Sequence, residues 1–146
     1  MRRISSRPTR HGTPHSVSAV LLDTHVVHWW SAEPKRVSAR AAKALEEADE
    51  LVVAAISWYE LAWMARHERI AVNVPIRSWL EGLAAQVRTI GVTPAVADAA
   101  VALPSSFPGD PADRLIYATA IEHGLTLVTG DKAMRNHGSP QSFTVW

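Results

Sequence analysis

The most informative stretch of the chain is Gly109-Asp110-Pro111-Ala112-Asp113-Arg114-Leu115-Ile116-Tyr117-Ala118-Thr119-Ala120. Two carboxylates, a proline and an arginine stand here directly before an apolar helical pattern. Asp110 is suited to cap a helix that starts at Pro111, and Gly124 is suited to end it. Packing alone does not explain so much charge at the start of a buried helix. We therefore interpret this stretch as part of an acidic site that binds a metal ion.

Short apolar runs alternate with helical patterns along the rest of the chain. Strands are expected over residues 18–22, 51–55, 89–92, 125–128 and 143–146. Helices are expected over residues 24–30, 37–48, from 57 onward, 75–87, 94–103, 111–123 and 132–136. Ser57 and Glu60 have the spacing of a capping box for the third helix. The alternation predicts an α/β fold, a three-layer α/β/α sandwich with a mainly parallel central sheet of four to five strands.

The length of 146 residues and the apolar fraction of 47% are typical of one domain with a sizeable core. We assign residues 17–146 to that domain and residues 1–16, rich in Arg, Ser, Thr, Pro and His, to a disordered basic leader. No apolar run is long enough to span a membrane. The absence of cysteine excludes disulfides and thiolate zinc sites, and it fits a cytoplasmic protein.

Basic residues are unevenly distributed. Four of the 15 lie in the first ten positions, which leaves 11 basic against 14 acidic residues in the remaining chain. Proteins that bind nucleic acid through surface charge usually carry a basic domain, whereas the net charge of this chain after its first ten residues is mildly acidic. Any action on nucleic acid is therefore expected to depend on a metal site with a few local basic residues.

Four carboxylates are expected at one edge of the sheet, because sites in parallel sheets lie outside the carboxyl ends of the strands. Asp23 follows the first strand, and Asp131 follows the fourth. Glu60 lies in the helix after the second strand, and Asp113 lies in the first turn of the helix before the fourth. Each position also suits a helix cap or a first-turn acid, which would need no ligand.

Capping does not explain why the four carboxylates would converge. Carboxylates on one rim repel one another, and some stay protonated unless a cation neutralises them. Mg²⁺ or Mn²⁺ is the simplest cation to expect here, since both prefer oxygen ligands. Such a metal ion activates a water molecule and stabilises the charge that develops on a phosphodiester.

Four segments resemble, in order and spacing, the motifs of PIN-domain proteins, and the chain is similar to the VapC-type toxins of bacterial type II toxin–antitoxin systems. The segments are Leu21-Leu22-Asp23-Thr24-His25, Ser57-Trp58-Tyr59-Glu60-Leu61-Ala62, Gly109-Asp110-Pro111-Ala112-Asp113-Arg114-Leu115-Ile116 and Leu127-Val128-Thr129-Gly130-Asp131. Pro108-Gly109 departs from the His-Gly that close relatives often have, which affects the detail of this loop and not the carboxylates.

The resemblance implies a Mg²⁺-dependent endoribonuclease that inhibits translation or growth. It implies that the catalytic and metal-binding residues are Asp23, Glu60, Asp113 and Asp131, with accessory roles for Asp110 and Thr129. It also implies a cognate antitoxin whose C-terminal segment lies across the site, and a homodimer or a toxin–antitoxin hetero-oligomer.

The remaining candidates have two interpretations each. Arg114 suits a phosphate or an antitoxin carboxylate, and equally an ion pair with Asp110 or Asp113. His25 and His28 suit a metal pair, or partly buried positions beside the site.

Tryptophans gather on the first and third expected helices. Core packing should take at least one of each pair, and an exposed tryptophan is a natural anchor for a partner. We therefore place an antitoxin groove near Trp29, Trp30, Trp58 and Trp63.

Three other classes stay open on sequence alone. One is a non-catalytic PIN-like module whose acidic rim docks a partner or a structural ion. The second is a phospho-accepting domain of the response-regulator kind with Asp23 as acceptor, although the Asp113-Arg114 pair has no role in it. The third is a metal-dependent nuclease acting on DNA, because nothing in the sequence reads a 2′-hydroxyl.

Overall fold

Five parallel strands form the centre of the computed structural model, in the order β3-β2-β1-β4-β5. The structure describes residues 18–137 and 143–146, so the predicted leader over residues 1–16 lies outside the described residues. The strands are β1 (Ala19–Leu22), β2 (Glu50–Ala54), β3 (Arg88–Ile90), β4 (Thr126–Val128) and β5 (Thr144–Val145). The predicted parallel sheet is confirmed.

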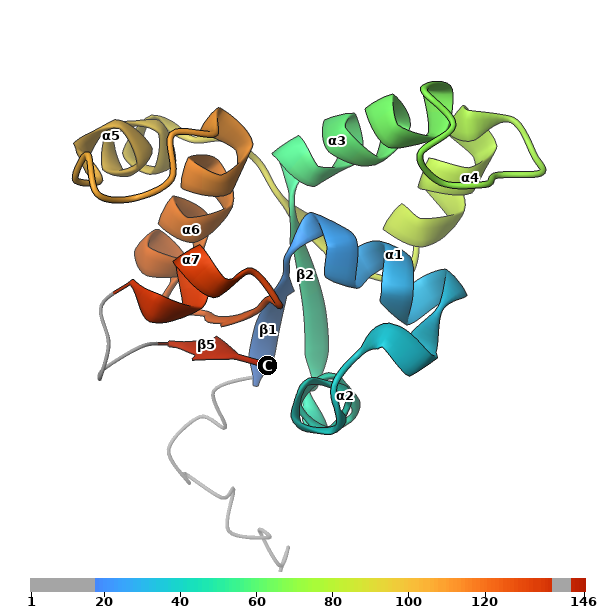
Figure 1. The fold of residues 1–146 in the computed structure, drawn as a ribbon, viewed down its shortest axis with the longest axis horizontal. Coiled ribbons are helices and arrows are strands. Elements are labelled where there is room, and N and C mark those ends of the chain that lie inside the picture. Colours follow the sequence, from blue (N-terminus) through green and yellow to red (C-terminus); the bar gives the residue numbers. More distant parts are fainter. Residues whose placement is uncertain (1–17, 138–142) are drawn as a thin grey trace, which may run out of the picture.

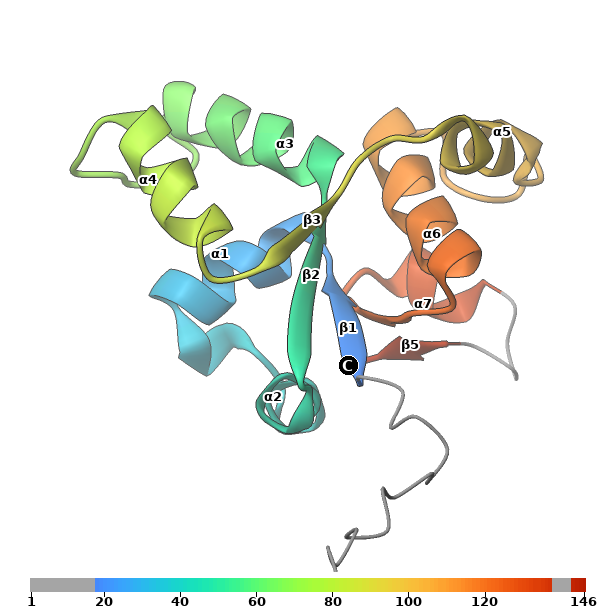
Figure 2. The ribbon, with the colours of Figure 1, turned by 180° about the vertical axis from the view of Figure 1, so that it is seen from behind.

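Helices cover both faces of this sheet (Figure 1). One face carries α1 (Thr24–Ala32), the short 3-10 helix η1 (Pro34–Arg36), α2 (Ala39–Glu47), α3 (Ala55–Arg66) and α4 (Ile76–Ala84). The other face carries α5 (Pro94–Ala102), α6 (Pro111–His123) and α7 (Lys132–Asn136). Figure 2 shows the same two groups from behind. The predicted three-layer α/β/α sandwich is therefore confirmed.

Strand β1 shows why the sheet needs a helical layer on each face. Its side chains alternate in direction, and all of its last three residues are buried. Leu21 packs in a cluster with Ile116 and Tyr117 of α6. Val20 and Leu22 pack in a second cluster with residues of α1 to α4. Burial of each such side chain contributes about 1.5–3 kcal/mol, so both layers are needed to cover the strand.

The direction of winding of the sheet reverses beside β1. The chain moves outward from β1 to β2 and β3, then returns to place β4 on the other side of β1. Ligands of open parallel sheets bind where the direction of winding reverses, outside the carboxyl ends of the strands. This order also differs from the 2-1-3-4-5 order of response-regulator domains, so that alternative is wrong for this chain.

Helix α6 has the predicted ends. Asp110 caps it, Pro111 is its first residue, and Gly124 follows it in the left-handed conformation with φ of 60°. Helix α3 differs from the prediction, because it begins at Ala55, directly after β2, with no side-chain cap. Ser57 lies inside the first turn and bonds across to α1, so the predicted capping box with Glu60 is wrong.

No helix in residues 18–137 or 143–146 has both the length and the apolar character that crossing a bilayer requires.

Candidate active site

Asp23 lies at the carboxyl end of β1 and is the only acidic side chain among the buried polar residues that the structure describes, with 5% of its surface exposed. Its Oδ1 accepts a hydrogen bond from the Thr24 backbone N–H at 2.7 Å, and its Oδ2 accepts one from the Thr129 hydroxyl at 2.8 Å. A carboxylate has about four lone-pair sites. The two bonds therefore fix Asp23 and leave acceptor capacity for a cation.

Thr24 holds two of the carboxylates at once. Its backbone N–H binds Asp23, and its hydroxyl donates to Glu60 Oε1 at 2.6 Å. A hydroxyl has a single proton, so Ser57 must be the donor in its 2.8 Å contact with the Thr24 hydroxyl. The sequence pattern does not identify either hydroxyl as part of the site. The available signals were that Thr24 adjoins Asp23 and that Ser57 lies one helical turn before Glu60.

The turn after β4 supplies the next carboxylate. The buried Thr129 hydroxyl donates to Asp23 and accepts from the Asp131 backbone N–H at 3.1 Å. Asp131 is exposed and caps α7. A Cβ on Gly130 would lie 3.1 Å from the Trp146 ring, so the final tryptophan packs directly on this turn. Thr129 therefore links Asp23 to the backbone that carries Asp131.

Asp110 and Asp113 lie at the start of α6. Asp110 Oδ1 accepts hydrogen bonds from the backbone N–H groups of Ala112 at 2.8 Å and Asp113 at 3.2 Å. Asp110 is exposed, whereas Asp113 lies in the first turn and is half-buried. The geometry makes Asp110 the cap that sets the start of the helix and Asp113 the more enclosed of the two carboxylates.

The acidic side chains repel one another in addition to being partly buried. Burial raises the pKa of Asp113 to about 7, and repulsion from Asp110, Asp23, Asp131 and Glu60 adds to the rise. Burial also raises the pKa values of Asp23 and Glu60, against the hydrogen bonds from Thr129 and Thr24 that lower them. The structure therefore brings all four predicted carboxylates, with Asp110, into one electrostatic cluster.

This donor set fits a hard divalent cation. Within the described residues, no three Asp, Glu or His side chains are placed to hold a single ion together. Mg²⁺ commonly keeps several waters and is held by one or two carboxylates together with substrate phosphates. The cluster fits that mode of binding, and it does not fit a cage in which all four carboxylates bind one ion directly.

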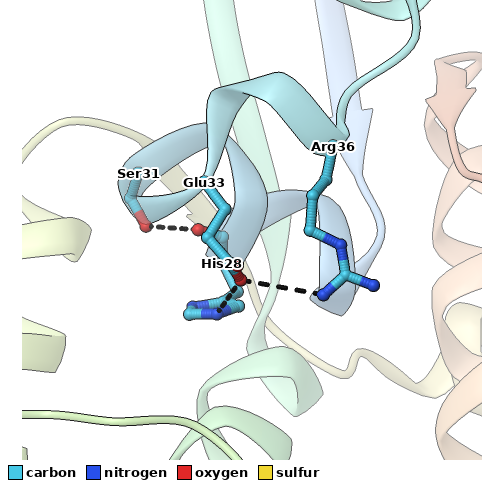
Figure 3. Close-up of polar contacts among 4 residues, drawn as sticks. All are labelled: His28, Ser31, Glu33 and Arg36. Atoms are coloured by element: carbon cyan, nitrogen blue, oxygen red, sulfur yellow. Dashed lines mark hydrogen bonds and ion pairs between the residues drawn. The ribbon is translucent and has the colours of Figure 1, made fainter.

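His25 and His28 do not form a metal-binding pair. His28 Nε2 lies 3.1 Å from Glu33 Oε2, and Arg36 Nη1 lies 3.8 Å from the same oxygen (Figure 3). His25 is exposed, and its ring stacks on Trp29 with the ring centroids 5.7 Å apart. His28 is therefore a partly buried residue bound to Glu33, and the metal interpretation is wrong.

Arg114 uses all five of its N–H donors on backbone carbonyls, at 3.0–3.3 Å. The acceptors are Ala100, Leu103, Pro104, Phe107 and Pro108. The first two lie at the C-terminal end of α5, where helix carbonyls lack partners and favour a cation. Among the described residues, Arg114 makes no ion pair with Asp110 or Asp113. Both sequence interpretations of Arg114 are therefore wrong: it fastens the loop that leads to the site.

We expect Arg114→Lys to lower the free energy of unfolding by about 2–4 kcal/mol. A lysine has three donors and no planar fork, so at least two carbonyls lose a charged partner. Urea unfolding monitored by circular dichroism measures the change. Arg77→Lys is the matched control, because the Arg77 side chain is 89% exposed and, among the residues that the structure describes, its one ion pair is with Glu81 in the next turn. Equal stability losses in the two variants would contradict the fastening role.

The four tryptophans separate into two pairs. Trp30 borders a hollow on the α2 side of α1, and Trp58 donates to the Thr89 hydroxyl at 3.0 Å. Both pack on the core. Trp29 also packs partly on the core. With Trp63 it lines one hollow of about 850 Å³ between α1 and α3, which we call the α1–α3 groove. A partner-binding role consequently stays a prediction for Trp29 and Trp63, and the contacts of Trp30 and Trp58 do not favour it.

A second hollow, of about 460 Å³, adjoins the groove. Trp63 and Met64 border both hollows, and the second is also lined by Glu60 and Asp110. The groove therefore adjoins a hollow that two of the clustered carboxylates line.

Comparison with known proteins agrees with this geometry. The model of the PIN domain matches residues 20–139. Ribonuclease VapC22 of Mycobacterium tuberculosis is 65% identical over 130 residues, which cover 89% of this chain and 100% of the relative. The chain therefore belongs to the PIN-domain family, as its four motifs predict.

Solved structures share the fold. A toxin–antitoxin complex from Klebsiella pneumoniae matches with a TM-score of 0.62 and 25% identity, covering 87% of this chain and 96% of that one. VapBC2 from Rickettsia felis, bound to a DNA fragment from its promoter, matches with a TM-score of 0.60 and 16% identity. The match covers 77% of this chain and 88% of that one. At the lower identity the likeness shows the fold alone.

Proposed function

We propose that the chain is a metal-dependent endoribonuclease, the toxin of a toxin–antitoxin pair. The observation that carries the proposal is the cluster of coupled carboxylates at the carboxyl ends of β1 and β4, with the Asp113 pKa raised to about 7. The identity of 65% to a relative named as a ribonuclease supports RNA as the substrate. Nucleases of this family are metal-dependent in general, and oxygen ligands favour Mg²⁺ or Mn²⁺.

The residues proposed to bind the metal, directly or through water molecules of its coordination shell, are Asp23, Glu60, Asp113 and Asp131. When bound, the metal would lower the pKa of a water molecule and stabilise the charge that develops on the phosphodiester. Thr24 and Thr129 fix the orientation of Asp23 by donating to its two oxygens. Thr24 also fixes Glu60. Asp110 sets the start of α6, and thereby the position of Asp113.

Thr24→Val is expected to lower RNA cleavage about 10- to 100-fold, the usual cost of removing a group that orients a metal ligand. The valine keeps the backbone N–H to Asp23 and loses the hydroxyl that holds Glu60. The measurement is the initial rate of cleavage of a labelled RNA across a Mg²⁺ titration. Thr119→Val is the control, because the Thr119 hydroxyl donates to the Leu115 carbonyl within α6. A rate equal to that of the control would contradict the positioning role of Thr24.

The remaining proposals concern partners and setting. We propose that a cognate antitoxin covers the acidic cluster and the α1–α3 groove, that residues 17–146 are one PIN domain, and that the toxin is a cytoplasmic homodimer when free. Toxin–antitoxin and VapBC complexes among the structural relatives support an antitoxin partner.

Induction of the gene in a host without the antitoxin tests the function. The proposal expects growth arrest and new RNA ends at discrete positions, and relief of both when the protein of the neighbouring reading frame is produced together with the toxin. Growth arrest without new RNA ends would favour a non-catalytic module. New ends in DNA alone would favour a nuclease acting on DNA.

A further inference from the structure

The acidic cluster cannot by itself attract an RNA strand. Asp110, Asp23, Asp131 and Glu60 all repel the charged form of Asp113, and the same negative charges would repel a phosphodiester. A metal ion offsets the repulsion at one phosphate only, so affinity for the rest of the strand has to come from other groups. Which groups bind the RNA strand beyond the cleaved bond is a question that rests on the proposed function.

Two ring platforms border the α1–α3 groove. Trp63 is 43% exposed, and His67 stacks on it with the ring centroids 4.0 Å apart and an angle of 20°. Across the groove, the exposed His25 stacks on Trp29 at 25°. In each pair, one ring restrains the other. This restraint reduces the conformational entropy that is lost when an RNA base stacks on the pair.

The groove also offers positive charge. Arg69 lines it and makes no ion pair among the residues that the structure describes. Arg36 lies 4.8 Å above the Trp29 ring and shares Glu33 with His28. A guanidinium without a carboxylate partner, in the same groove as an exposed indole, is a suitable receptor for a phosphate next to a stacked base.

The groove lies beside the acidic cluster. Trp63 and Met64 border both the groove and the smaller hollow that contains Glu60. His25 interacts electrostatically with Asp23 and Glu60, which places it beside the cluster. A volume of about 850 Å³ lies in the range of sites that hold whole ligands.

We propose that the α1–α3 groove binds the single-stranded RNA next to the cleaved bond, with one base stacked on Trp63 and its phosphate bound by Arg69. An antitoxin that covers the groove would then block the path of the substrate as well as the metal ligands.

The test uses full-length toxin purified free of antitoxin. The probe is a fluorescein-labelled RNA of 12 nucleotides with mixed sequence and no self-complementarity. Binding is measured by anisotropy at low ionic strength with EDTA, so that the probe is not consumed. We expect Trp63→Leu to raise the Kd about tenfold, because the substitution removes the ring on which one base stacks. Trp63→Phe should keep most of the affinity.

Arg69→Gln should weaken binding about fivefold and reduce its dependence on salt, whereas the exposed control Arg77→Gln should do neither. With Mg²⁺ present, the KM for RNA should rise in Trp63→Leu and Arg69→Gln while kcat stays near the wild-type value. Both residues are exposed, and circular dichroism verifies that the variants fold.

Wild-type RNA affinity in both Trp63→Leu and Arg69→Gln would overturn the inference, and so would a wild-type protein that binds no RNA. If the variants lose the antitoxin but bind RNA normally, the groove is a protein-docking surface and the inference is wrong. Failure of the proposed function is visible separately, as a wild-type protein that binds the probe but cleaves no RNA with Mg²⁺ or Mn²⁺.

Discussion

Asp23→Asn is expected to reduce RNA cleavage by a factor of about 10³ or more while the fold is kept. The side chain is nearly isosteric, and Asn still offers one oxygen to the hydrogen bonds that hold Asp23. The substitution removes the negative charge of Asp23, whose two carboxylate oxygens are oriented by Thr24 and Thr129. The measurement is single-turnover cleavage of a labelled RNA with Mg²⁺ at neutral pH.

The same substitution should stabilise the metal-free protein. Burial raises the pKa of Asp23, which means that the folded protein disfavours the charged form. Asn removes that cost, so the Tm in EDTA should rise by a few degrees. Asp98→Asn is the control, because Asp98 is exposed on α5. Cleavage by Asp23→Asn at the rate of the Asp98→Asn control would show that Asp23 has no catalytic role.

The second large effect is a dependence of stability on pH and metal. In the folded protein the pKa of Asp113 is about 7, against an ordinary value of 3.8. Between these values the folded state binds a proton that the unfolded state has released. The stabilisation is therefore complete below pH 3.8 and is lost as the pH rises to about 7. In EDTA, the wild type should lose stability relative to Asp113→Asn across this window.

Divalent cations should reverse that loss. A metal ion binds the deprotonated carboxylates of the folded state and stabilises it by mass action. The Tm of the wild type at pH 8 should thus rise with Mg²⁺ or Mn²⁺, and the rise should be smaller in Asp113→Asn. A difference in Tm between the two proteins that stays constant from pH 4 to 8, with and without metal, would contradict the coupling of Asp113 to the cluster.

The layers and the carboxylates were predictable because they depend on local patterns. Alternating apolar runs indicate which segments are strands, and parallel strands place their carboxyl ends at one edge. Asp23 directly follows the first strand and Asp131 comes three residues after the fourth, so the order of the elements places both at the same edge of the sheet. The ends of α6 were predictable for the same reason, since Asp110-Pro111 and Gly124 determine them within a few residues.

The errors concern side chains whose partners are distant in the sequence. Ser57 has the local signature of a cap, yet its hydroxyl bonds to Thr24, 33 residues away. Arg114 directly follows Asp113 and lies one helical turn after Asp110, yet its five donors bind carbonyls of the preceding loop and helix. The helix and strand propensities of single residues cannot predict these contacts, because the contacts form only when α5 packs on α6 and α1 packs on α3.

The central claim is that the carboxylate cluster cleaves RNA with the help of a divalent metal. The most direct test incubates purified, antitoxin-free protein with matched single-stranded RNA and DNA, in EDTA and across a titration of Mg²⁺ and Mn²⁺, beside Asp23→Asn. We predict discrete RNA fragments that require both the metal and the wild-type carboxylate, with the DNA intact. Cleavage of RNA in EDTA, or equal cleavage by Asp23→Asn, would contradict the account.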